Sequence, residues 1–295
     1  MTPGGHPLVR LAWVTGVGLL VVGVALAALA RAGRPGLLVI ALGLVLLLAG
    51  YVAYLVRHVA FLRSVERAES ALDAGDLERA RVALAPLLER YGGIPAVQRA
   101  AGLATYALGD PLAAAALLER AARSYGDDAK LAATLVASYA ALNRGGDARR
   151  AAALAPRAAD VQLALAWAEL VALGGDRANG ARAVRELAER ADVERSPARR
   201  AMAAALRAVA AARAGEGDLV RAELRTAAAE REGLAAYERA FLGYLEGVAL
   251  REAGWPEEAR RAFEAAMQAA PGTIGEALAR RERANMLATG PAPAP

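Results

Sequence analysis

The sequence predicts an all-α protein in two parts, a pair of apolar helices followed by a stack of short amphipathic helix pairs. Two observations lead to this prediction. The first 58 residues contain two uncharged apolar runs and no acidic residue. The remainder is rich in alanine, and a Gly-Asp pair at 75–76 recurs at 109–110 between stretches of helical periodicity.

Each apolar run is long enough to cross a lipid bilayer. Residues 11–30 and 37–56 each lack any charge, and a helix of about 20 residues spans about 30 Å, the thickness of the hydrocarbon layer. The intervening Arg-Ala-Gly-Arg-Pro-Gly suits a tight turn. We therefore expect a two-helix transmembrane hairpin within 1–58, which contacts the bilayer through 11–56.

A cleaved signal peptide is the alternative interpretation, since Ala28-Leu29-Ala30 resembles a cleavage site. The hairpin is favoured because the apolar core exceeds that of a signal peptide and a second run follows at once. Four arginines flank the side that holds both ends of the hairpin and two lie in the turn. This bias predicts a multi-pass protein of the bacterial inner (cytoplasmic) membrane with its large domain in the cytoplasm.

A repeated pattern links the segments 71–92 and 106–126. Each segment contains an apolar helix, a turn at Gly-Asp, a second apolar helix and a helix breaker. Glycine suits the left-handed position that ends a helix, and aspartate can cap the next one. The identities all fall at one constant offset: Gly75 with Gly109, Asp76 with Asp110, Ala80 with Ala114, Leu84 with Leu118, Tyr91 with Tyr125, and Gly92 with Gly126.

The segment YLEGVALREAGWPEEARRAFEAAMQAAP, 244–271, carries the same pattern of small, large and turn residues. The matching positions are Gly247, Gly254, Ala259, Phe263, Ala266 and Pro271. The pattern resembles the tetratricopeptide repeat (TPR), a helix–turn–helix unit of about 34 residues. This resemblance implies a TPR-like α-solenoid over 59–287, and we expect a disordered tail at 288–295.

Spacing between turn glycines is irregular in the middle of the chain, which predicts degenerate repeats with helices of unequal length. A final helix near 273–287 is expected to cover the end of the stack. The expected pairs are 60–74 with 77–91, 96–108 with 111–125, 128–142 with 147–155, 158–173 with 178–191, 197–214 with 218–231, and 235–253 with 256–270.

The composition argues against enzymatic chemistry. Cysteine is absent, and the two histidines, His6 and His58, leave 59–295 without the commonest general base. Glu257 and Glu258 follow a helix-starting proline and point about 100° apart, so they suit a helix start better than an acid and base pair. We expect no catalytic residue, metal, cofactor or small-molecule substrate.

The net charge of +5 does not indicate a nucleic-acid partner. Residues 1–58 hold four arginines and no acid, so the remainder is nearly neutral. Nucleic-acid binding would require the positive charge to gather where phosphates lie. We expect protein partners and the bilayer, but no nucleic acid.

In TPR proteins the first helices of the repeats line a concave binding face. By this resemblance, the candidate protein-binding positions are Glu69, Arg99, Tyr106, Phe241, Tyr244 and Arg251. The sequence thus predicts a non-enzymatic, membrane-anchored scaffold that mediates protein–protein interactions. The alternative is an envelope-assembly or secretion accessory factor whose repeats face the periplasm or the exterior.

Overall fold

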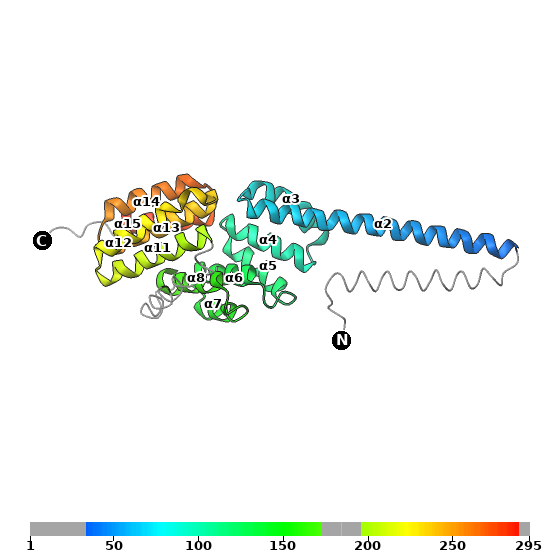
Figure 1. Cartoon of the computed structure of the whole chain (residues 1–295), viewed down its shortest axis with the longest axis horizontal. Coiled ribbons are helices and arrows are strands. Elements are labelled where there is room, and N and C mark those ends of the chain that lie inside the picture. The colour runs from blue at the N-terminus through cyan, green and yellow to red at the C-terminus, as the bar shows by residue number, and fades with distance from the viewer. Residues whose placement is uncertain (1–33, 173–183, 185–195, 289–295) are drawn as a thin grey trace. The chain divides into compact units, whose positions relative to one another are not determined.

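The protein is all-α in the part that the computed structural model describes, residues 34–172, 184 and 196–288 (Figure 1). No strand occurs in these ranges, and the arrangement is consistent with an α-solenoid. The chain divides into unit 1, Met1–Glu66, and unit 2, Arg67–Pro295. The helices are α2 (Arg34–Asp73), α3 (Leu77–Tyr91), α4 (Pro95–Ala107), α5 (Pro111–Ala122), α6 (Ala129–Ala141), α7 (Gly145–Ala152), α8 (Ala159–Trp167), α11 (Pro197–Ala214), α12 (Gly217–Ala229), α13 (Ala236–Glu252), α14 (Pro256–Ala269) and α15 (Ile274–Ala288).

Four of the expected helix pairs are confirmed by helix packing. α4 packs against α5, α6 against α7, α11 against α12, and α13 against α14. The first helices also pack in series, with α6 against α8 and α11 against α13. α15 covers both α13 and α14, as expected for a closing helix. The second helix expected at 178–191 and the tail after Ala288 lie outside the described residues.

The turns between paired helices have the geometry that the repeat pattern predicts. Gly75, Gly109 and Gly254 have φ of 76°, 83° and 79°, a left-handed conformation that favours glycine. The side chains of Asp76 and Asp110 each accept a hydrogen bond from a backbone N–H three residues later. These aspartates therefore cap α3 and α5, because they satisfy a donor that has no partner within the helix.

A glycine of the first helix lets the second helix approach closely in two repeats. A Cβ atom on Gly102 of α4 would lie 2.5 Å from Cγ of Leu118 on α5. In the last repeat a Cβ atom on Gly247 of α13 would lie 2.4 Å from the ring of Phe263 on α14. Leu118 and Phe263 are completely buried, and each follows its glycine at the same spacing in the sequence. The same small-to-large contact thus fixes both helix pairs.

Turns of the first two repeats also contact the last repeat within unit 2. Gly75 lies against Ala235, where an added Cβ atom would come within 2.5 Å of the Ala235 Cβ atom. Gly109 lies against the backbone of Thr273, which precedes α15. These residues are far apart in the sequence, and the local repeat pattern gave no signal for the contact. The inner faces of the helices therefore enclose a space.

The predicted transmembrane hairpin gains no support from the structure. The run 11–30 lies outside the described residues, and the run 37–56 falls within the long helix α2. Among the residues described, no helix combines the length and the apolar character that a membrane span requires. The helix α2 continues without a break beyond the apolar run and ends at Asp73.

Substitution of Gly247 by alanine should destabilise the protein. The new methyl group would collide with the buried Phe263 ring, and overpacking of this kind costs about 1–3 kcal/mol. Gly146→Ala in α7 is the matched control, because the nearest atom to its Cβ position is 3.8 Å away. There alanine should stabilise the helix by up to about 1 kcal/mol. Denaturant unfolding followed by circular dichroism measures both, and equal effects would contradict the packing argument.

Candidate functional site

A cavity of about 260 Å³ lies inside unit 2, between the first helices of successive repeats. Its walls come from α4, α6, α8, α11 and α13, and Ile274 at the start of α15 completes them. Large apolar or aromatic side chains dominate the wall. They include Tyr106, Leu163, Trp167, Met202, Tyr237 and Phe241.

Aromatic side chains pack edge to face at one side of the cavity. The rings of Trp167 and Phe241 are 5.4 Å apart at 68°, and Phe241 is 5.6 Å from Tyr244. Trp167 is 2% exposed and Tyr244 is fully buried. Neither the indole Nε1 of Trp167 nor the hydroxyl of Tyr244 has a hydrogen-bond partner. Such atoms are costly to bury, so they mark an unusual place in an otherwise well-packed interior.

The hydroxyls of two tyrosines lie near each other here. Burial raises the pKa of Tyr106, and the neighbouring Tyr244 raises it further. Burial is also the main cause that raises the pKa of Tyr244, and Glu282 adds to it. The indole N–H of Trp167 acts in the opposite direction, so it lies close to the Tyr244 oxygen although the two make no well-formed hydrogen bond. Tyr106, Tyr244 and Trp167 thus influence one another in the region of the apolar cavity.

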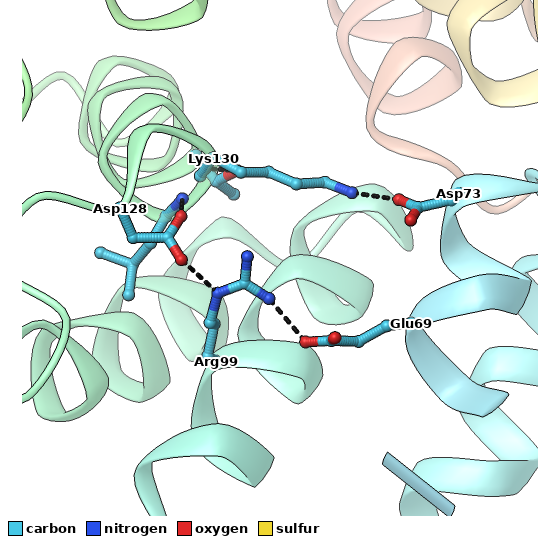
Figure 2. A network of polar contacts seen from close by, with 7 residues as sticks. Glu69, Asp73, Arg99, Asp128 and Lys130 are labelled. Carbon is cyan, nitrogen blue, oxygen red and sulfur yellow. Dashed lines mark hydrogen bonds and ion pairs between the residues drawn. The ribbon is translucent and has the colours of Figure 1, made fainter. Parts of the chain in front are cut away.

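A network of charged side chains joins the first helices of three repeats (Figure 2). The guanidinium of Arg99 on α4 donates to Glu69 on α2 and to Asp128 before α6, both at 2.5 Å. Lys130 on α6 forms an ion pair with Asp73 at the end of α2. Asp128 also accepts from the backbone N–H of Leu131 and so caps α6.

Burial favours the neutral form of Asp128, but the Arg99 hydrogen bond and charge outweigh it. Together with backbone N–H donors they hold the pKa of Asp128 below its ordinary value of 3.8. For Arg99, burial opposes the charged form, and the two carboxylates overcome this and raise the pKa. Arg99 and Asp128 are therefore both charged at neutral pH, and their contact holds neighbouring repeats together.

The six sequence-predicted binding residues fall into two groups. Tyr106 and Phe241 line the cavity, and Tyr244 contacts Phe241 from a fully buried position. Glu69 and Arg99 belong to the charged network, while Arg251 pairs with Glu252 at 2.7 Å and with Glu282. The structure does not test whether any of them binds a protein, so that role stays a prediction.

Other cavity residues escaped the sequence analysis. Trp167 and Leu163 lie on α8, in the degenerate middle of the chain where the repeat register is weakest. Arg199 of α11 donates two hydrogen bonds to Asp160 of α8, at 2.7 and 2.8 Å, and both residues line the cavity. Repeat positions could not identify them because the spacing of the turn glycines is irregular there.

Two tyrosine-to-phenylalanine substitutions should differ in their effect on stability, because one hydroxyl has a hydrogen-bond partner and the other has none. The hydroxyl of Tyr139 donates to Glu119 at 2.5 Å, so Tyr139→Phe should lower the free energy of unfolding by about 1.5–3 kcal/mol. Tyr244→Phe removes a buried hydroxyl that has no partner and should leave stability unchanged or raise it. Urea unfolding at pH 7 measures both. A loss for Tyr244→Phe as large as that for Tyr139→Phe would contradict the assignment.

The charge of Asp128 should make a pH-dependent contribution to stability. Because its pKa is lowered by folding, the contribution is present above pH 3.8 and disappears as the pH falls below it. Asp128→Asn retains a capping residue but removes the charge. At pH 7 the variant should be less stable by about 0.5–1 kcal/mol, and the gap should close toward pH 3. A gap that is independent of pH in thermal unfolding would refute this.

Within the described ranges, no group of three or more His, Asp or Glu side chains is placed to hold a metal ion. A scan against protein-family models finds no match to this chain, and a search of curated proteins finds none either.

Proposed function

We propose that this protein is a non-enzymatic, membrane-anchored TPR-like scaffold that binds protein partners at a bacterial inner membrane. The cavity in unit 2 carries this proposal. It is mainly apolar, it lies between the first helices of the repeats, and ion-paired charged residues such as Asp160 and Arg199 form part of its wall. An apolar centre within a polar surround is the usual anatomy of a protein-binding surface.

The membrane anchor in this proposal rests on the uncharged run 37–56, parts of which are exposed apolar side chains on α2. Val45, Leu48 and Val56 are 62%, 61% and 63% exposed, and they belong to a segment that is uncharged from 37 to 56. Exposed apolar surface of this extent is costly in water and marks contact with a membrane or another protein. The matching uncharged run at 11–30 in the sequence favours the bilayer as that contact.

Site-specific crosslinking tests the binding face. A photoreactive benzoylphenylalanine is placed at Ala198, a cavity residue, in the full chain in its own membranes. We expect a discrete protein adduct after irradiation. Leu112 on α5 is the control position, since it is 65% exposed and lies on a second helix. Adducts at Leu112 but not at Ala198, or at neither, would count against the proposed binding face.

Cysteine labelling tests the orientation of the repeats. The chain has no native cysteine, so Leu112→Cys introduces a single exposed thiol. With repeats in the cytoplasm, a membrane-impermeant maleimide should label this thiol only after the inner membrane is opened. Labelling in intact spheroplasts would instead favour the accessory factor with repeats outside the cytoplasm. Loss of the chain from the membrane fraction on deletion of 11–56 checks the anchor itself.

A further inference from the structure

We propose that the cavity in unit 2 receives one tyrosine side chain from a segment of the partner protein. This inference rests on the protein-binding function proposed above and specifies the chemistry of the partner. Three features of the cavity lead to it: its size, the unpartnered polar atoms beside it, and the charge of its wall.

The size of the cavity fits a single ring. At about 260 Å³ it exceeds the apolar cavity of roughly 150 Å³ that admits benzene. It falls below the range of about 300–1,000 Å³ typical of sites for larger ligands. Leu163 and Met202 provide apolar contacts, and Phe241 offers a ring for edge-to-face packing. A guest of one aromatic side chain would fill this space, whereas a dinucleotide or a folded element would not.

The unpartnered polar atoms favour a guest with a hydrogen-bonding edge. Trp167 lines the cavity with an indole that can only donate, and its Nε1 has no partner. The buried hydroxyl of Tyr244 also lacks a partner and lies near that of Tyr106, which lines the cavity. A phenol hydroxyl both accepts and donates, so a tyrosine guest can satisfy atoms that an aliphatic or plain phenyl guest leaves unpaired.

The charged residues of the wall favour basic neighbours in the partner segment. Asp160 and Arg199 neutralise each other through two hydrogen bonds. Glu238 remains as an additional carboxylate of the wall, and it accepts from the backbone N–H of Ala235. The three side chains together carry a net negative charge. A lysine or arginine beside the inserted ring therefore complements the site, whereas an acidic neighbour is repelled.

Binding of small probes to the full chain tests the inference. The probes are 4-methylphenol and toluene, which reproduce tyrosine and phenylalanine side chains, and the blocked tripeptides Lys-Tyr-Lys, Lys-Ala-Lys and Glu-Tyr-Glu. We expect 4-methylphenol to bind about fivefold to tenfold more tightly than toluene, the ratio that one net hydrogen bond provides. Lys-Tyr-Lys should bind at least about tenfold more tightly than Lys-Ala-Lys, and more tightly than Glu-Tyr-Glu at low salt.

Two variants locate the binding. Ala164→Leu adds bulk to the cavity wall from α8 and should abolish binding of the aromatic probes, while Ala116→Leu on the exposed side of α5 should not. If Ala164→Leu fails to fold, Tyr244→Phe retains the ring and removes only the unpartnered hydroxyl. It should weaken 4-methylphenol binding and leave toluene binding nearly unchanged. Saturation-transfer NMR detects these weak interactions, and circular dichroism confirms folding.

Three outcomes would overturn the inference. Equal affinity for 4-methylphenol and toluene would show that the guest needs no hydroxyl group. Binding of 4-methylphenol without binding of Lys-Tyr-Lys would indicate a site for a free small molecule. Binding that survives Ala164→Leu would place the probes elsewhere. In each of these cases, a protein crosslinked at Ala198 would still support the proposed scaffold function. Probe binding without any crosslinked protein would instead contradict the scaffold function.

Discussion

The close approach of two helices in the second and last repeats is the constraint on which the rest of unit 2 depends. In the second and last repeats a glycine of the first helix faces a large, completely buried side chain of the second, Leu118 or Phe263. This contact fixes how the two helices lie against each other. Once that geometry repeats, the first helices pack in series and their inner faces surround a common space. The cavity is thus a product of helix pairing.

The interior of unit 2 combines small and large residues, and it contains buried polar atoms without hydrogen-bond partners. Alanine dominates the contacts between helices, and the larger aromatic side chains gather at the cavity. Trp167 and Tyr244 bring an N–H and a hydroxyl into this region without partners. Phenylalanine at position 244 would fill nearly the same space without the unpartnered hydroxyl. These buried polar atoms distinguish the cavity from one that is lined by apolar groups alone.

Sequence reasoning succeeded where structure is determined by neighbours in the chain. The turn glycines Gly75, Gly109 and Gly254 and the cap at Asp76 follow from local conformational preferences, and the structure confirms them. Helix lengths follow from apolar periodicity for the same reason. The contact of Gly75 with Ala235 depends on the accumulated rotation of several repeats, including degenerate ones. No local pattern specifies that rotation, so neither the contact nor the cavity was predictable.

The contact between distant repeats also bears on how the array can change in length. An open solenoid gains or loses repeats readily, because each new one meets only its immediate neighbours. Here the turn at Gly75 fits against Ala235, and the turn at Gly109 against Thr273. One additional repeat between the second and the last repeat would move Ala235 and Thr273 away from Gly75 and Gly109 by the length of one helix–turn–helix unit. The number of repeats is therefore fixed by closure, and this solenoid can diverge in its side chains far more easily than in its size.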